Sequence, residues 1–205
     1  RPPRSTLFPY TTLFRSVAQA KAASELWQHK QISNEIVDEI VEKITFEEGN
    51  IVIIGMPSGG KSTIGSLLAK QLGREFVDID DYIPEAAGKS IADIFAEDGE
   101  EAFRVIETQV TGDVCKRSGL VIACGGGVVT KARNYDLLHQ NGIVLLLKRP
   151  LELLVSDGRP MAITKGIPAL ARDRGPKYDA WGDIVVSNDA DPMIVVGRAL
   201  EKLQK

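Results

Sequence analysis

From residue 51 onward, short apolar runs alternate with segments in which apolar residues recur every three or four positions. The short runs predict strands over residues 51–55, 75–78, 120–124, 142–147 and 183–186. The segments of longer period predict helices over residues 61–72, 91–95, 100–116, 130–139, 151–156, 169–180 and 192–204. Because strands this apolar that alternate with helices are typical of a parallel sheet covered on both faces, we predict one α/β domain over residues 51–205.

Residues 17–46 have a helical pattern of their own. A plausible cap at Ser33-Asn34 precedes apolar residues spaced three or four apart, which form one face: Ile36, Val37, Ile40, Val41 and Ile44. An amphipathic helix without an evident partner in the chain indicates part of something larger. Residues 47–50 are predicted to be a polar linker, so residues 17–50 form a separate helical segment.

The first sixteen residues differ from the rest. They contain three arginines, three prolines and no acidic residue. Neither the strand period of 2 residues nor the helix period of 3.6 residues continues through them. Residues 7–16, LFPYTTLFRS, match the in-frame translation of a common short-read sequencing adapter. We therefore interpret residues 1–16 as an unstructured, adapter-derived artefact rather than as part of the fold.

Composition narrows the class of protein. With 43% hydrophobic and 26% charged residues and a formal net charge of −3, the 205-residue chain has no general basic surface for nucleic acid. Its apolar runs fall short of the roughly 18 residues of a membrane span, so we expect no membrane partner. Cys115 and Cys124 show neither metal-binding nor disulfide spacing, and are expected to be core residues of a reduced, cytoplasmic protein.

The stretch GMPSGGKS, residues 55–62, satisfies the pattern GxxxxGK[ST] between a predicted strand and a predicted helix. Glycines there let backbone N–H groups converge on phosphate oxygens at the start of the helix. Lys61 would reach the β- and γ-phosphates, and the Ser62 hydroxyl would bind Mg²⁺. The motif predicts a bound nucleoside triphosphate and leaves the phosphate acceptor open.

Two carboxylates follow the second predicted strand. Asp78 ends that strand and Asp80 lies two residues later, so in extended chain both would point to the same side. One could bind the metal while the other meets a substrate hydroxyl. The alternative is that Asp80 or Asp81 only caps a helix.

Three further features point to an anionic acceptor. Arg104 and Glu107 are three residues apart on a predicted helix and can form an ion pair. Either Glu107 holds the Arg104 guanidinium group in place to bind a substrate carboxylate, or the two form an ordinary surface pair. The run Gly125-Gly126-Gly127 after a buried strand favours close approach by a ligand. Arg159, Arg172 and Arg174 lie in a predicted mobile loop and the following helix, where an arginine could neutralise a transferring phosphoryl group, unless the loop is simply basic and exposed.

In this order, the segments GMPSGGKSTIG, FVDIDDYI, GKSIADIFAEDGEEAFRVIE, CGGGVV, GRPM and RGPKY resemble shikimate kinase across residues 51–205. The resemblance implies a P-loop nucleoside-monophosphate-kinase-like fold, a three-layer α/β/α arrangement with a five-stranded parallel sheet and a mobile lid. It also implies ATP-dependent phosphorylation of the shikimate 3-hydroxyl. The alternatives are another small-metabolite P-loop kinase, such as gluconate kinase, and a nucleotide-binding regulatory module.

The same resemblance assigns roles by position. ATP would be bound by Ser58, Gly59, Gly60, Lys61, Ser62 and Thr63, with Ser62 and Asp78 on Mg²⁺. Asp80 would bind the ring hydroxyls and orient or deprotonate the reacting one. Shikimate would be bound by Asp80, Arg104, Gly125, Gly126, Gly127 and Arg174, with both arginines on its carboxylate. Arg159 would be the lid arginine that approaches ATP.

The chain also departs from the family pattern. Ser58 stands where glycine is usual, which is expected to tighten the loop. The segment of residues 153–159 is shorter and less basic than in most family members and lacks an arginine usually found before the lid. The stretch between Arg159 and Arg174 is short as well. The lid is therefore where ATP affinity or turnover is expected to differ.

Upstream, VAQAKAASELW (residues 17–27) resembles the C-terminal helix of shikimate dehydrogenase. The segment lacks a dinucleotide-binding unit, so no dehydrogenase activity is expected from this chain. We predict a kinase domain that is monomeric and natively fused to a dehydrogenase.

Overall fold

The structure is a computed structural model that describes residues 12–154 and 166–204. The chain divides into two compact units, one up to Glu48 and one from Gly49 onward. The second unit therefore begins two residues before the boundary expected at residue 51.

The first unit is a pair of helices, α2 (Thr12–Gln28) and α3 (Asn34–Glu48), which pack on each other. His29, at φ 51°, ends α2, and the Ser33 hydroxyl accepts a hydrogen bond from the Glu35 N–H (3.2 Å) at the predicted cap of α3. Three expectations are corrected here. The amphipathic helix α3 has a partner in the chain, α2; residues 12–16 are helical rather than unstructured; and α3 continues through the first half of the stretch expected to be a linker.

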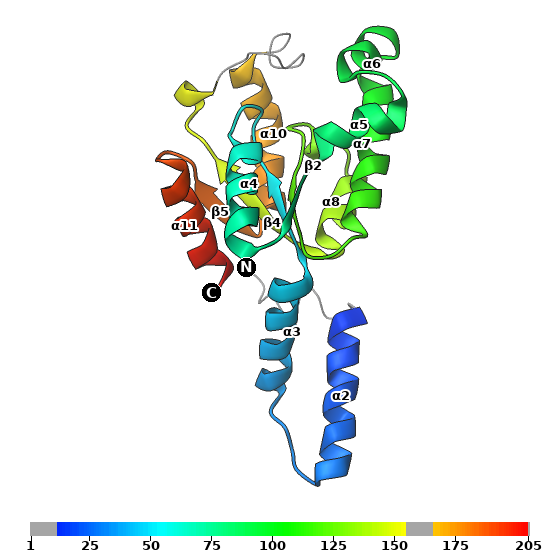
Figure 1. The fold of residues 1–205 in the computed structure, drawn as a ribbon, viewed down its shortest axis with the longest axis vertical. Helices are drawn as coiled ribbons and strands as arrows, with labels where there is room; N and C mark the ends of the chain where they lie inside the picture. The colour runs from blue at the N-terminus through cyan, green and yellow to red at the C-terminus, as the bar shows by residue number, and fades with distance from the viewer. Residues whose placement is uncertain (1–11, 155–165, 205) are drawn as a thin grey trace. The chain divides into compact units, whose positions relative to one another are not determined.

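The second unit contains a five-stranded parallel sheet in the order β2-β3-β1-β4-β5 (Figure 1). Its strands are β1 (Asn50–Ile54), β2 (Glu75–Asp78), β3 (Leu120–Ala123), β4 (Gly142–Lys148) and β5 (Ile184–Ser187). Each lies within about one residue of a predicted strand. The predicted α/β fold is confirmed.

Helices cover both faces of this sheet (Figure 1). One face carries α4 (Lys61–Leu72) and α11 (Pro192–Leu203), and the other carries α7 (Gly99–Cys115), α8 (Arg133–His139) and α10 (Ile167–Trp181). Short elements complete the unit: α5 (Ile79–Ala87), α6 (Ile91–Glu97), η1 (Val128–Thr130) and η2 (Leu151–Leu153). No helix is predicted from the sequence where α5 lies, which contains Pro84, and the helix predicted over residues 130–139 begins at Arg133, as α8, after η1. The helix expected at 151–156 is only η2 within the described residues.

The main core lies between the sheet and the second group of helices. Val52, Ile54, Ile122 and Val144 from the strands pack there with side chains of α7, α8 and α10. Cys115 and Cys124 are free and buried, as predicted, and burial raises the pKa of Cys115 to about 12.

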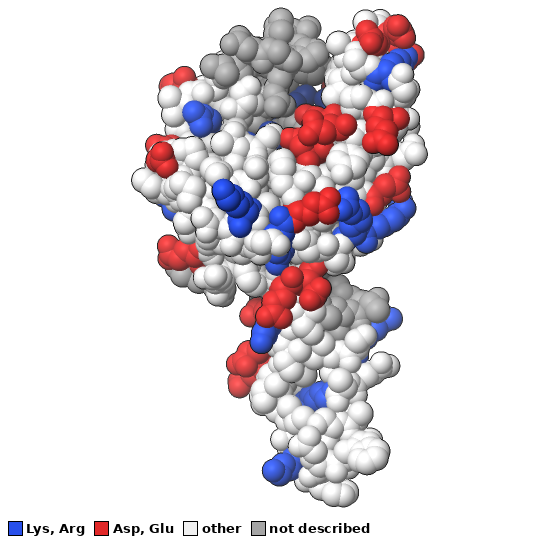
Figure 2. Space-filling model, in the orientation of Figure 1, with Lys and Arg blue, Asp and Glu red and all other residues white. Residues whose placement is uncertain are grey.

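Within residues 12–154 and 166–204, none of the helices has the length and hydropathy needed to cross a membrane. On the face shown in Figure 2, basic and acidic side chains are interspersed.

Candidate active site

The predicted site residues gather at the carboxyl ends of the strands. The phosphate loop follows β1, Asp78 ends β2, the triple glycine follows β3, Arg149 follows β4 and Asn188 follows β5. In open parallel sheets, ligands bind at this edge.

The phosphate loop has its predicted strand and helix on either side, and α4 begins at Lys61. The Lys61 ammonium donates to the carbonyls of Gly55 (3.1 Å) and Met56 (2.9 Å), so it folds back along the loop. Gly60 has φ 83° and lies against Asn188, whose Nδ2 donates to the Gly59 carbonyl (2.8 Å). A Cβ on Gly60 would lie 2.7 Å from that nitrogen. The position therefore requires glycine for two reasons, its left-handed backbone and the lack of room for a side chain.

Ser58, the departure noted in the sequence, has φ 58°. Left-handed backbone is disfavoured for residues with a Cβ, and this explains why glycine suits the position. The loop keeps its path with serine at a local conformational cost.

Ser62 and Asp78 meet as a pair. The Ser62 hydroxyl donates to Asp78 Oδ2 (2.6 Å), which places two hard oxygen ligands side by side beneath the loop. Among the described residues there is no group of three or more His, Cys, Asp or Glu side chains that could hold a metal ion.

Asp78 is also the helix cap. Its Oδ1 accepts a hydrogen bond from the Asp80 N–H (3.1 Å), so neither Asp80 nor Asp81 caps α5. Asp80 lies in the first turn of α5 rather than in extended chain, which corrects the period-2 argument. Its Oδ1 nevertheless faces Gly125, 2.8 Å from where a Cβ on that glycine would be.

The Arg104–Glu107 pair is buried, so the alternative of a surface pair is wrong. The Arg104 guanidinium donates to Glu107 Oε2 (2.7 Å) and to Glu100 (3.2 Å). Arg104 is 4% exposed and Glu107 is fully buried. Burial raises the pKa of Glu107, and the Arg104 charge opposes this rise. Arg104 Nε and Glu107 Oε1 have no hydrogen-bond partner in the described structure.

The triple glycine is needed because the protein's own side chains approach it. A Cβ on Gly125 would lie 2.8 Å from both Asp80 and Glu107, one on Gly126 would press on Pro57, and one on Gly127 would overlap the Arg104 guanidinium. Contacts within the protein are therefore enough to require glycine here, and the approach of a ligand to this backbone stays a prediction. The glycines let the polar side chains of the site pack against the chain that follows β3.

Arg174 reaches the same place from α10. It is 2% exposed, and its Nη1 donates to the Gly126 carbonyl (2.9 Å), which also accepts from the Tyr178 hydroxyl. Arg174 Nε is buried without a partner in the described structure. Burial raises the pKa of Tyr178 to about 12, so its hydroxyl remains a donor at neutral pH.

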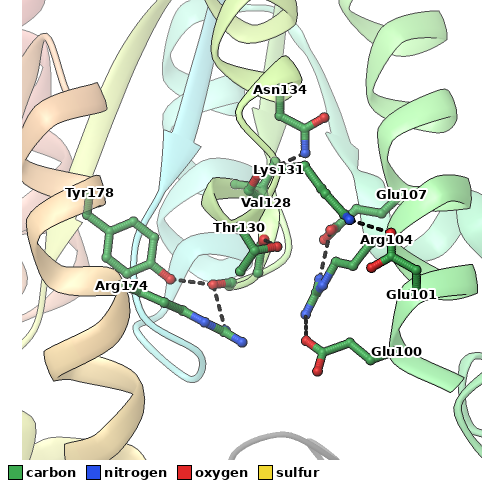
Figure 3. Close-up of polar contacts among 12 residues, drawn as sticks. Glu100, Glu101, Arg104, Glu107, Val128, Thr130, Lys131, Asn134, Arg174 and Tyr178 are labelled. Carbon is green, nitrogen blue, oxygen red and sulfur yellow. Dashed lines mark hydrogen bonds and ion pairs between the residues drawn. The ribbon is translucent and has the colours of Figure 1, made fainter.

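Figure 3 shows the Arg174 and Arg104 guanidinium groups pointing into one space from α10 and α7. Two cations with unpaired N–H groups beside a carboxylate suit a small molecule that carries both an acid and hydroxyl groups. Arg172 is exposed on α10, while Arg159 lies outside the described residues.

Sequence reasoning missed two residues of this site. Tyr178 lies four positions after Arg174, a helical spacing that could have joined the two side chains. Asn188 follows the last strand with no local pattern to mark it, and only the sheet order brings it to the phosphate loop.

Comparison with known proteins gives one consistent result. The family model for shikimate kinase matches residues 57–204. The shikimate kinase of Clostridium botulinum (strain Alaska E43 / Type E3) is 37% identical over 164 residues, covering 77% of this chain and 96% of that protein. That of Parasynechococcus marenigrum is 39% identical over 163 residues, covering 75% and 85%.

Solved structures agree. Shikimate kinase from Acinetobacter baumannii in complex with shikimate has a TM-score of 0.71 and 33% identity, covering 78% of this chain and 95% of that chain. The Aquifex aeolicus enzyme has a TM-score of 0.67 and 30% identity, covering 76% and 96%. With the phosphate loop, the paired arginines and this similarity along nearly the whole second unit, the chain belongs to the shikimate kinase family.

Proposed function

We propose that the chain transfers the γ-phosphoryl group of ATP to the 3-hydroxyl of shikimate, giving shikimate 3-phosphate and ADP. The observation that carries this proposal is the pair of buried guanidinium groups, Arg104 and Arg174, at the same sheet edge as the phosphate loop. A buried cation with an unpaired N–H favours an anionic partner strongly, because leaving it unpaired is costly.

The roles follow from position. Both arginines bind the shikimate carboxylate, and Glu107 holds Arg104 in place through their 2.7 Å contact. The backbone of Gly125, Gly126 and Gly127 lines the substrate, and Asp80 orients or deprotonates the reacting hydroxyl.

On the donor side, residues 58–63 surround the ATP phosphates, and Lys61 turns from the loop carbonyls to the γ-phosphate. Ser62 and Asp78 would hold Mg²⁺, and their 2.6 Å contact fits two ligands of one hard cation. Bound there, Mg²⁺ would neutralise phosphate charge during transfer. Arg159 is proposed as the lid arginine that approaches ATP.

The test is ADP release by the full chain with ATP and Mg²⁺, comparing shikimate with gluconate as acceptor. We expect release that depends on shikimate. Release with gluconate alone would favour a different small-metabolite kinase. ATP binding without release in either case would indicate a regulatory nucleotide-binding module and contradict the proposal.

For the first unit, we propose a remnant of a shikimate dehydrogenase natively fused to a kinase domain that is itself monomeric and cytoplasmic. Leu26 (76% exposed) and Trp27 (87%) lie next to each other at the end of α2, where a dehydrogenase body could cover them. Residues 1–16 are proposed to derive from a sequencing adapter. Sequencing the source DNA upstream of codon 17 tests both proposals. We expect dehydrogenase codons there, whereas finding the codons of residues 1–16 in native DNA would contradict the adapter origin.

A further inference from the structure

Arg149 lies beside the phosphate loop without any role in the motifs considered so far. It follows β4 directly, and its side chain is half-buried. Its Nε donates to the Leu153 carbonyl in η2 (3.2 Å), which orients the guanidinium group. Nη1 then lies 3.9 Å from the position that a Cβ on Gly60 would take.

Gly60 lies at the part of the loop that faces the phosphates, directly before the start of α4. Its N–H belongs to the backbone groups that converge on phosphate oxygens, and Lys61 begins the helix whose positive end faces them. Asn188 follows β5 directly. Its side-chain Nδ2 donates to the Gly59 carbonyl (2.8 Å), and its backbone N–H donates to the Lys148 carbonyl (2.6 Å). The end of β4 is therefore fixed against the loop, and Arg149 with it.

We propose that Arg149 is a nucleotide-binding residue whose guanidinium group contacts the polyphosphate of the bound nucleotide. This inference rests on the proposed function, in that the loop must bind a nucleoside triphosphate. The contact to Leu153 uses one of five guanidinium N–H donors, and those on Nη1 and Nη2 suit phosphate oxygens. Arg149 would thus add a second cation, held by the sheet rather than by the lid, to the charge of Lys61.

The test uses the full chain and calorimetric titration with ADP and, separately, with inorganic tripolyphosphate. Arg149→Gln keeps a donor for the Leu153 carbonyl but removes the charge, whereas Arg149→Lys keeps the charge. Arg133→Gln, at an exposed position on α8, is the matched control. We expect Arg149→Gln to weaken both ligands about tenfold, Arg149→Lys to restore most of that loss, and the control to change neither. Shikimate affinity should stay within twofold in all variants, which also reports intact folding.

Three results would overturn the inference. An ADP affinity of Arg149→Gln within twofold of wild type would show that the residue makes no nucleotide contact. A loss for ADP with unchanged tripolyphosphate binding would place Arg149 on the base. An equal loss in Arg149→Lys and Arg149→Gln would show that charge is irrelevant and that Arg149 only positions η2. Wild-type protein that binds no ADP would instead refute the proposed function itself.

Discussion

The two halves of the site are built in different ways. The donor half is one continuous segment, residues 55–63, whose loop presents backbone N–H groups and accepts hydrogen bonds from the side chains of Asn188 and Lys61. The acceptor half consists of side chains from α5, α7 and α10 around the chain after β3, brought together from positions up to 94 residues apart, Asp80 to Arg174.

Their polar groups also differ. In the donor half, the Lys61 ammonium and the Ser62 hydroxyl have protein partners. In the acceptor half, Arg104 Nε, Glu107 Oε1 and Arg174 Nε are buried and have no hydrogen-bond partner among the described residues. A loop of backbone groups tolerates side-chain changes but not changes of backbone path, whereas buried unpaired side chains discriminate between ligands. We therefore expect acceptor specificity to depend on buried side chains, and donor binding to depend on the backbone of the loop together with a few cationic side chains.

The largest effect is expected from Asp80→Asn. Removing the carboxylate that we propose to orient or deprotonate the reacting hydroxyl should lower kcat about 10³-fold while ADP affinity stays within twofold, because general-base contributions are of this order. ADP release and ADP titration measure the two quantities. Asp81→Asn, on an exposed neighbour, is the control and should leave both unchanged. Unchanged turnover in Asp80→Asn would remove Asp80 from the mechanism.

Arg174→Ala should raise the KM for shikimate about 30- to 100-fold with ADP affinity nearly intact, because it deletes a charge-assisted contact in the acceptor half only. Arg172→Ala changes an exposed arginine on the same helix and should leave the KM as it is. Initial rates at varied shikimate, with calorimetry for ADP, test this. Equal losses for shikimate and ADP would contradict the division between the halves.

The same division explains what the sequence could predict. Strands, the fold class and the donor half follow from local patterns, because a phosphate loop is continuous and its helix begins at Lys61, where the pattern changes period. The Arg104–Glu107 pair was visible as a spacing, but its burial depends on tertiary packing.

Other features of the acceptor half needed the fold. The first turn of α5 carries Asp80, yet Pro84 obscured the helix, which is fixed by the Asp78 cap. The glycines after β3 indicated close approach, but only three dimensions show that Arg104 and Glu107 make that approach. Tyr178 and Asn188 act through contacts 52 and 129 residues away in sequence, which no local pattern encodes.

Gly127→Ala should disturb the acceptor half through the backbone. The new Cβ would overlap the Arg104 guanidinium, which is buried and held by Glu107, so Arg104 must shift. We expect the KM for shikimate to rise about tenfold and the free energy of unfolding to fall by about 1–3 kcal/mol. Gly197→Ala is the control, because nothing lies near its Cβ position within α11 and it should stabilise the protein by up to about 1 kcal/mol. An unchanged KM in Gly127→Ala would mean that Arg104 does not need its present position.

The smallest effect is expected from Ser58→Gly, which tests whether the donor half depends on any side chain at this position. Glycine relieves the left-handed backbone at φ 58°, so the free energy of unfolding should rise by up to about 1 kcal/mol, while ADP affinity stays within twofold.

Ser90→Gly is the contrasting control for Ser58→Gly. Ser90 has φ −66° and its hydroxyl accepts from the Asp93 N–H (3.1 Å) at the cap of α6. The same substitution there should lower the free energy of unfolding by a few tenths of a kcal/mol, since a cap is lost and no strain is relieved. Denaturant titration measures the change in the free energy of unfolding of both variants, which we expect to be positive for Ser58→Gly and negative for Ser90→Gly. A more than fivefold loss of ADP affinity in Ser58→Gly would show that the Ser58 hydroxyl binds the nucleotide, and the donor half would then share the acceptor half's dependence on side chains.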